Sequence, residues 1–442
     1  MKPRINLYRT IILSIVLLFG LKLQAQQNAE KICINWQTQV GELKKAHWAI
    51  NDYETITPSL ISDAGLCKYS QSLKPELVRI HQALIADSLI NPTTKTWDKV
   101  RIKKCFDLAQ KAFPEAKFLI NPICEWPKWM GVEGSILNPD QEKVIIRLYS
   151  EFAVVVKELN IPVLAIEIFN EREMGYDEKG KLTLLWNLYN RISKAIQAID
   201  SNQQIAGPAL TWPKKEWIES FLDQCGKNTQ IFTWHCYVSG SPGTSNHDIV
   251  YKGIEKIDSF AHFTHDEIAK RGLSKLQNYL TEYNIQWVWE PLELRHGSNV
   301  GAVFQALAVT KAALQNMDGV MVWHLKGLSY GLINGQDEIR STGQLYLWGN
   351  KYLVGKMVET MSPDPRIEIV AVTRPDGKKS ILLINKSDEQ LKIDVSPSRI
   401  GFKVNYGAQL TSEEFLPQKI AWEEPELKLL ACSVTLLSSS KQ

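Results

Sequence analysis

Metal-binding cysteine motifs are missing from this chain of 442 residues. Its seven cysteines lie far apart, without a CxxC pair or a Cys/His spacing of the kind that binds zinc. We therefore expect no metal site and no cofactor. The odd number leaves at least one thiol unpaired, and buried free thiols are the ordinary interpretation of most of them. They are Cys33, Cys67, Cys105, Cys124, Cys225, Cys236 and Cys432.

Other class signatures are missing as well. No glycine-rich phosphate-binding turn follows an early strand-like segment, and the chain has no low-complexity tract. An excess of charge of one sign is also lacking, since the formal net charge is +3. Residues 1–25 hold four cations and no acid, so the remainder has a formal charge of −1. This balance gives no support for nucleic acid or an anionic membrane as partner.

Only one long apolar run is present, and it lies at the N-terminus. The run IILSIVLLFG follows Lys2, Arg4 and Arg9, and the small residue Ala25 comes shortly after it. A basic start, a short apolar core and a small residue predict a secretory signal peptide over residues 1–25. A transmembrane anchor is the alternative, but the run is short for a span and Lys22 interrupts its end. We expect export to the periplasm or medium, with no membrane association after cleavage.

From residue 46 to 361 the chain alternates short apolar runs with amphipathic segments. Such alternation predicts a parallel sheet covered by helices, and eight units over this length fit a (β/α)8 TIM barrel. A doubly wound open sheet is the competing architecture, which usually carries the missing glycine-rich turn. Strands are expected at 46–51, 76–81, 116–123, 163–171, 203–210, 229–237, 276–284 and 318–325. Helices are expected at 97–112, 141–160, 182–199, 213–225, 298–317 and 350–361.

After residue 361 the pattern changes. Short strand-like runs are separated by turns such as RPDGKK and NKSDEQ, which predicts a small antiparallel β-sandwich domain over residues 362–442. The segment 26–45 contains the run ICINWQ and is expected to add a strand to this domain.

Two carboxylates stand out at the ends of predicted barrel strands. The active site of such a barrel lies at the C-terminal ends of its strands, where Glu171 and Glu282 are expected. A single glutamate at a strand end usually caps a helix or pairs with a lysine. Two on one rim can instead act together, one as acid and one as nucleophile or base, in cleaving a glycosidic bond. Polar and aromatic residues crowd the same rim, as binding of a sugar requires.

The motifs around these residues resemble those of a known enzyme clan. EIFNE is similar to the strand-four signature of clan A glycoside hydrolases, and LTEYN is similar to their strand-seven motif. Together with VRIH, FLINPICEWPKWM, IAGPALTW and TWHCY, in that order, they resemble family 39, which holds β-xylosidases and α-L-iduronidases. The resemblance covers nearly the whole chain after the predicted signal peptide.

This resemblance implies individual roles. Glu171 matches the acid/base, and Asn170 matches the residue that contacts the sugar 2-hydroxyl. Glu282 matches the nucleophile, with Tyr237 orienting it and Arg79 keeping it ionised. His81, His235 and Trp323 match sugar contacts of the family. Glu125 and Trp126 are expected as further sugar contacts because they follow the third predicted strand at the same rim.

The sequence also departs from the clan pattern. Phe169 stands where a tryptophan is usual, and Arg172 stands where a proline is usual. A local ion pair of Arg172 with Glu173 or Glu167 is favoured over contact with an acidic substrate. Glu167 itself is expected to be a paired charge inside the barrel. Each of five tryptophans is equally consistent with a sugar subsite or with packing: Trp126, Trp129, Trp212, Trp287 and Trp289.

The sequence therefore predicts a retaining glycoside hydrolase that acts on a plant- or algal-type oligo- or polysaccharide. Double displacement requires the two carboxyl groups to lie roughly 5–5.5 Å apart. A non-catalytic carbohydrate-binding barrel and a transglycosidase that uses the same carboxylates are the alternatives. The sugar, the linkage, exo or endo action and the oligomeric state stay open.

Overall fold

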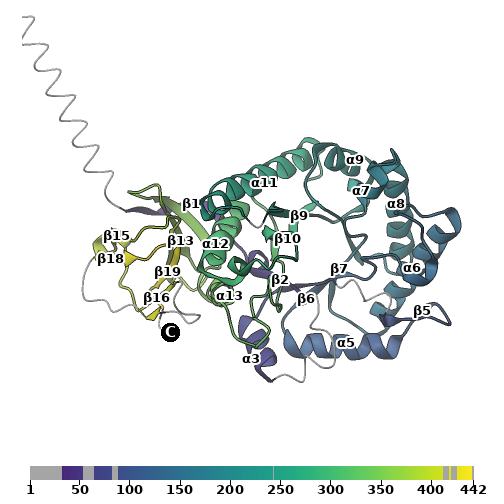
Figure 1. Cartoon of the computed structure of the whole chain (residues 1–442), viewed down its shortest axis with the longest axis horizontal. Helices are drawn as coiled ribbons and strands as arrows, with labels where there is room; N and C mark the ends of the chain where they lie inside the picture. The colour runs from purple at the N-terminus through teal and green to yellow at the C-terminus, as the bar shows by residue number, and fades with distance from the viewer. Residues whose placement is uncertain are drawn as a thin grey trace, which may run out of the picture.

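The structure, a computed structural model, describes residues 32–52, 64–81, 88–241, 243–411, 418–419 and 426–440. It consists of a barrel and a smaller β domain that lie side by side (Figure 1). The predicted signal peptide lies outside the described residues and stays a prediction. Within the described ranges, no helix is both long and apolar enough to cross a membrane. All seven cysteines fall in these ranges and are free thiols.

Eight parallel strands of the described chain close into a barrel in the order β10-β11-β2-β3-β6-β7-β8-β9. This confirms the predicted (β/α)8 fold. The strands are β2 (Ala49–Asp52), β3 (Leu77–His81), β6 (Lys117–Asn121), β7 (Val163–Glu167), β8 (Gln204–Leu210), β9 (Ile231–Ser239), β10 (Gln277–Gln286) and β11 (Gly319–Val322).

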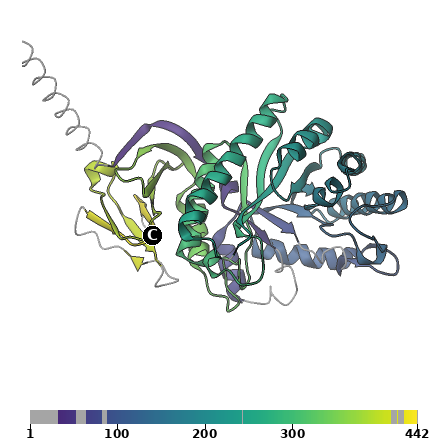
Figure 2. The same ribbon diagram turned by 45° about the horizontal axis from the view of Figure 1, so that its top comes forward.

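Helices surround the barrel (Figures 1 and 2). Their sequences carry ordinary start signals: Asn138 and Gln141 form a capping box around Pro139 at the start of α6. The long helices are α3 (Ala64–Leu73), α5 (Lys99–Ala112), α6 (Pro139–Glu158), α8 (Leu182–Ile199), α9 (Lys215–Cys225), α11 (Lys252–Lys270), α12 (Asn299–Leu314) and α13 (Ser341–Tyr352). Two short ones, α7 (Glu173–Asp177) and α10 (Asn246–Val250), follow β7 and β9.

Some helix predictions need correction. The sequence did not indicate α3 or α11, and the helix expected at 350–361 is wrong. Helix α13 ends at Tyr352, and β12 (Gly355–Met361) follows it. Tertiary pairing decides this segment, because β12 lies between β1 (Cys33–Leu43) and β13 (Ile367–Thr373) as a strand of the β domain.

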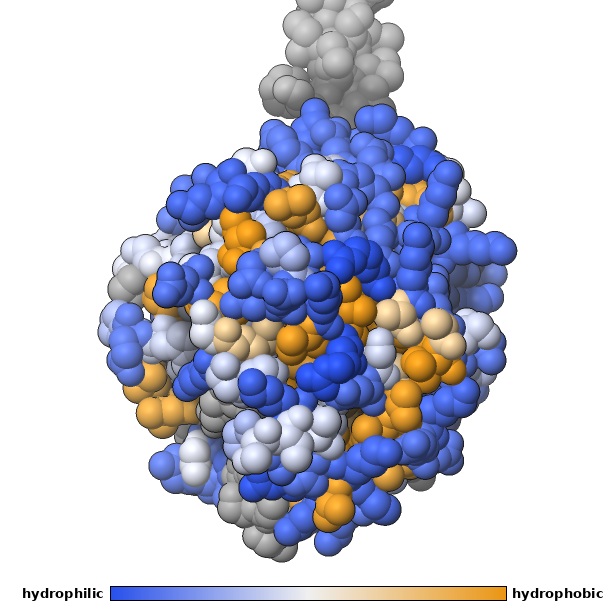
Figure 3. Space-filling model, turned by 90° about the vertical axis from the view of Figure 1, so that its right-hand side faces the viewer, coloured by the Kyte–Doolittle hydropathy of each residue, from blue (hydrophilic) through white to orange (hydrophobic). Residues whose placement is uncertain are grey.

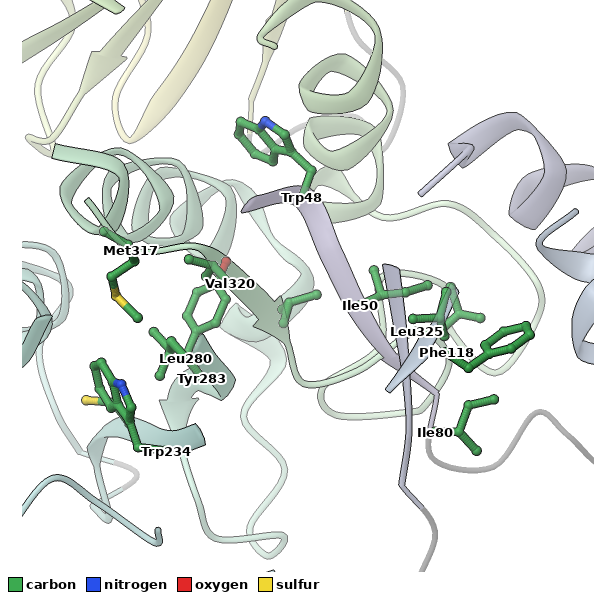
Figure 4. Packing of buried hydrophobic residues seen from close by; sticks show 14 of the residues in the cluster. Trp48, Ile50, Ile80, Phe118, Trp234, Leu280, Tyr283, Met317, Val320 and Leu325 are labelled. Atoms are coloured by element: carbon green, nitrogen blue, oxygen red, sulfur yellow. The ribbon is translucent and has the colours of Figure 1, made fainter. Parts of the chain in front are cut away.

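Alternation along the barrel strands separates two cores. In β3, Val78 and Ile80 point outward into the large cluster between strands and helices, part of which Figure 4 shows. Leu77 joins a smaller apolar layer inside the barrel with Leu119 and Ala165. Arg79 and His81 share the inward side with Leu77 but lie nearer the C-terminal end of the strand. The barrel interior therefore changes from apolar at one end to polar at the end that carries the site.

The β domain consists of two antiparallel sheets in the described residues. Strands β1-β12-β13-β14-β19-β16-β17 form the larger, and β15-β18 form the smaller. Ile369 in β13 packs between the two sheets, whereas Val370 and Val372 of the same strand pack toward the barrel. The strands not yet placed are β14 (Lys379–Asn385), β15 (Leu391–Asp394), β16 (Tyr406–Leu410), β17 (Gln418–Lys419), β18 (Glu426–Leu429) and β19 (Ser433–Ser438).

Hydrophilic residues cover most of the side of the barrel opposite to the β domain, and hydrophobic residues show between them in small groups (Figure 3).

Candidate active site

A cavity of about 580 Å³ opens at the C-terminal ends of the barrel strands. Such a volume is typical of a small-molecule site. The residues that line it come from six of the eight strand ends or the loops after them: His81, Asn170, Glu171, Met174, Thr211, Trp212, Tyr237, Glu282, Trp287, Trp289, Trp323 and Tyr330.

The two carboxylates predicted from the sequence face each other in this cavity. A carboxylate oxygen of Glu171, one of Glu282 and a ring nitrogen of His235 all lie within 4.8 Å of one another. Glu282 is in β10, whereas Glu171 lies four residues beyond the end of β7.

The chain after β7 adopts an unusual path. The predicted strand 163–171 ends early, at Glu167, and Phe169 and Glu171 have left-handed φ values of 70° and 53°. Such values are uncommon for non-glycine residues and persist only where surrounding contacts hold them. Here the Phe169 N–H donates to the Tyr149 hydroxyl (3.2 Å), and the Glu171 N–H donates to the Ala209 carbonyl (2.9 Å). These bonds hold Asn170 and Glu171 at the cavity wall.

Each oxygen of Glu282 accepts a hydrogen bond. Arg79 Nη1 donates to Oε1 (2.7 Å), and the Tyr237 hydroxyl donates to Oε2 (2.9 Å). The side chain is 7% exposed, so both bonds act in a largely dry environment. A cation and a hydroxyl in these positions stabilise the ionised carboxylate.

Arg79 connects the polar residues beneath the cavity. It is fully buried, and it lies 2.7 Å from both Glu167 Oε2 and Glu282 Oε1. The pair with Glu167 confirms the predicted interior ion pair. Arg79 Nη2 also donates to Asn170 Oδ1 (2.8 Å), and Nη1 donates to Asn51 Oδ1 (2.9 Å). Because Asn170 Oδ1 is engaged in this way, its amide nitrogen is the end that can donate to a ligand.

Glu171 lies in a different environment. Burial raises the pKa of Glu171 to about 7, against the opposing effect of the Arg79 and Arg172 cations. His235 Nδ1 lies 2.7 Å from Glu171 Oε1. Burial also lowers the pKa of His235 to about 4, so this imidazole is neutral at pH 7. The site therefore pairs a carboxyl that holds its proton near neutral pH with one that is hydrogen-bonded as a carboxylate.

The cluster of Glu171, His235 and Glu282 could also be considered as a cation site, since its atoms lie close enough. Both Glu282 oxygens already accept hydrogen bonds, however, and Arg79 supplies the neighbouring positive charge. This donor set fits proton transfer better than ligation of a metal ion.

The structure places Glu125 and Trp126 outside the cavity lining. Glu125 pairs with Arg172 (2.8 Å), and the Arg172 guanidinium lies over the Trp126 ring, 5.3 Å from its centroid. The predicted partners of Arg172, Glu173 and Glu167, are therefore wrong. Glu173, the first residue of α7, instead accepts a hydrogen bond from the Thr211 N–H (2.7 Å).

The other predicted residues lie at the cavity or directly beneath it. His81, Tyr237 and Trp323 line it. Arg79 and His235 are not in the lining, but Arg79 donates to Glu282 and His235 contacts Glu171. Trp212, Trp287 and Trp289 are also in the lining, and they are 41%, 49% and 50% exposed.

Met174, Thr211 and Tyr330 line the cavity but are not among the predicted site residues, although Thr211 lies within the IAGPALTW motif. Thr211 directly follows β8, so the rule that strand ends carry the site could have identified it. Tyr330 lies eight residues beyond β11, in a loop whose sequence carries no comparable signal.

Comparison with known proteins gives matches among glycoside hydrolases. No family model matches the sequence. A β-xylosidase from Geobacillus stearothermophilus is 23% identical over 166 residues, which are 36% of this chain and only 32% of that relative's length. The match therefore spans about a third of the curated relative.

Solved structures match over almost the whole chain. A monomeric β-xylosidase from Caulobacter crescentus has a TM-score of 0.70 at 17% identity, covering 92% of this chain and 99% of that one. A family 51 α-L-arabinofuranosidase from Bifidobacterium longum has a TM-score of 0.68 at 12% identity, with the same coverage. A family 30 endoxylanase from Clostridium papyrosolvens has a TM-score of 0.62 at 14% identity, again with this coverage. These matches do not single out family 39; they show that the chain has the fold of clan A glycoside hydrolases.

Proposed function

We propose that this protein is a retaining glycoside hydrolase that acts on neutral sugars. The observation that carries the proposal is the approach of Glu171 and Glu282 to within 4.8 Å across an aromatic-lined cavity. Retaining enzymes hold their carboxyl groups roughly 5–5.5 Å apart, whereas inverting enzymes need roughly 6.5–9.5 Å to admit a water. The short separation favours double displacement.

The environments of the two carboxylates suit different roles. Glu282, hydrogen-bonded to Arg79 and Tyr237, attacks the anomeric carbon as a carboxylate. Glu171, whose pKa burial raises to about 7, gives its proton to the leaving oxygen. A water molecule then hydrolyses the glycosyl-enzyme, and Glu171, now ionised, takes the proton from that water. Asn170 is placed to donate to the sugar hydroxyl beside the reacting carbon.

The charges at the cavity favour a neutral sugar. Among the described residues, none of the side chains that line it is a lysine or arginine, and two are the glutamates. The undescribed segments 53–63 and 82–87 contain no lysine or arginine either. Arg79 and Arg172 do not line the cavity, and both are paired with acids. Arg79 pairs with Glu167 and Glu282, and Arg172 pairs with Glu125. A uronide carboxylate would therefore meet negative charge without a cation to offset it.

Aromatic side chains supply the remaining recognition. Trp212, Trp289 and Trp323 offer apolar faces against which the C–H face of a sugar ring can pack. Because the curated relative and one solved neighbour are named β-xylosidases, xylosides are the first substrates to test.

Two variants test the proposal. Glu282→Gly should abolish turnover of a 4-nitrophenyl glycoside, and added azide should restore part of it by replacing the missing nucleophile. Glu171→Ala should still hydrolyse substrates with good leaving groups, but it should lose activity on substrates whose leaving oxygen must be protonated. Glu178→Ala, an exposed glutamate on the same loop, is the control and should behave as wild type. Normal turnover of natural linkages by both site variants would refute the proposal.

A further inference from the structure

Two neighbouring loops form one side of the cavity. Residues 287–298 follow β10, and residues 323–340 follow β11. The first loop contributes Trp287 and Trp289 to the lining, and the second contributes Tyr330. The relative position of these loops therefore decides the shape of the wall that a sugar would meet.

Burial of apolar side chains contributes little to holding the first loop. Its large apolar residues face solvent, as does one residue of the second loop. Burial of apolar side chains is the usual source of stability for a loop. Because residues 287–298 bury few of theirs, polar contacts must hold this loop in place. The exposed side chains are Trp287 (49%), Trp289 (50%), Leu292 (40%), Leu294 (64%) and Leu328 (58%).

Arg340, at the start of α13, makes polar contacts to both loops. Its Nη1 donates to the carbonyls of Ser329 (2.9 Å) and Gly331 (3.1 Å), and its Nη2 donates to the carbonyl of Leu294 (3.1 Å). The residue is 5% exposed, and in the described chain all of its side-chain hydrogen bonds go to main-chain carbonyls. Burial lowers the pKa of Arg340 to about 10, which leaves it charged at neutral pH.

Gly297 makes room for this guanidinium. A Cβ at position 297 would lie 1.6 Å from Arg340 Nε, so any larger residue would displace the arginine. The sequence thus provides both the side chain that bridges the loops and the space for it.

The carbonyls that Arg340 binds flank Tyr330 on both sides. The Tyr330 ring stacks on His296 with centroids 4.3 Å apart and meets Trp289 edge-on at 4.9 Å. The Tyr330 hydroxyl also donates to the Val288 carbonyl (3.0 Å). The positions of Tyr330 and Trp289 in the wall therefore depend on the bridge beneath them.

We propose that Arg340 is a positioning residue that fixes Tyr330 and Trp289 as a rigid wall for the bound sugar. The role in sugar binding rests on the proposed function, whereas the contacts that Arg340 makes to the two loops do not. Loss of the bridge should weaken binding of the sugar more than it slows the chemical step, because Arg340 touches neither carboxylate.

Matched substitutions test this with the 4-nitrophenyl glycoside that the wild type hydrolyses fastest. Arg340→Lys keeps the positive charge but removes the planar guanidinium that reaches both loops. Gly297→Ala keeps the guanidinium but displaces it. Both should raise KM by about tenfold or more while kcat stays within about threefold. Gly335→Ala, where the added Cβ meets no atom within 4 Å, and Arg366→Lys in the β domain should leave both constants unchanged.

Amide hydrogen exchange supplies a readout that needs no substrate. In Arg340→Lys, amides of residues 287–298 should exchange faster than in wild type, whereas those of β13 should not change. If the wild type hydrolyses no glycoside, the proposed function fails while exchange still tests the bridge. Unchanged exchange in this loop would overturn the bridge. Faster exchange with an unchanged KM would overturn the role of the wall in sugar binding.

Discussion

The Tyr237 hydroxyl lies 2.9 Å from Glu282 Oε2, whereas Arg79 binds the other oxygen of this carboxylate, Oε1. The two donors hold both oxygens of Glu282, so its orientation is fixed before a substrate arrives. Such preorganisation is expected where a carboxylate must attack a carbon in one defined direction.

Replacement of this hydroxyl tests its contribution. Tyr237→Phe should lower kcat by about tenfold to hundredfold, because a hydrogen bond to a charged group is worth roughly 1.5–3 kcal/mol. Steady-state kinetics on an aryl glycoside measures the effect. Tyr406→Phe removes a hydroxyl in the β domain and serves as control, since it should keep wild-type kcat. Equal kcat values for the two variants would show that the Tyr237 hydroxyl does not assist Glu282.

The raised pKa of Glu171 predicts a pH dependence. The protonated fraction of Glu171 falls as the pH rises through about 7, so kcat/KM for a substrate with a poor leaving group should decline above that pH. With a dinitrophenyl glycoside, whose leaving group needs no proton, the decline should vanish.

A neighbouring carboxyl provides the control for this profile. Burial also raises the pKa of Glu173 to about 7, but Glu173 does not line the cavity. Glu173→Gln should therefore keep the alkaline decline for the poor leaving group. Loss of the decline in this variant would assign the titration to Glu173 instead of Glu171.

Arg172 and Glu125 act on the pKa of Glu171 in opposite directions. The Arg172 cation lowers this pKa, and the Glu125 carboxylate raises it. Arg172→Met should therefore move the alkaline decline of kcat/KM to higher pH, and Glu125→Gln should move it to lower pH. Profiles measured at low ionic strength give the clearest shifts. Shifts in the same direction would mean that the variants act through altered packing of Trp126.

Substrate charge supplies another test. On a panel of 4-nitrophenyl glycosides, the best neutral sugar should exceed any uronide in kcat/KM by about hundredfold or more, because like charges brought together cost several kcal/mol. The matched pair of glucoside and glucuronide differs only in the carboxylate. Hydrolysis of a uronide within about tenfold of the best neutral substrate would contradict the neutral-sugar proposal.

Much of the fold could be predicted because it follows local rules. The helix expected at 182–199 has these bounds in the structure, since its apolar positions recur at helical spacing. The segment 355–361 was mispredicted because its strand conformation depends on pairing with β1, which lies more than 300 residues earlier in the chain. Pairing over such a distance leaves no local signal.

The site was predicted where a motif coincides with a strand end. Glu171 and Glu282 satisfied both conditions, and the structure brings them together. Trp126 also follows a strand, but it packs under Arg172. The clan pattern usually has a proline at this position, so it did not indicate this contact. Tyr330 was missed because its place depends on Arg340 and His296, in loops whose paths the sequence does not specify.

The anomeric configuration of the first-formed product tests the proposed double displacement most directly. Proton NMR should follow the wild-type protein as it hydrolyses its best aryl glycoside, before the released sugar mutarotates. Two inversions, one by Glu282 and one by water, predict a first product with the same anomeric configuration as the substrate. A product of inverted configuration would contradict nucleophilic attack by Glu282.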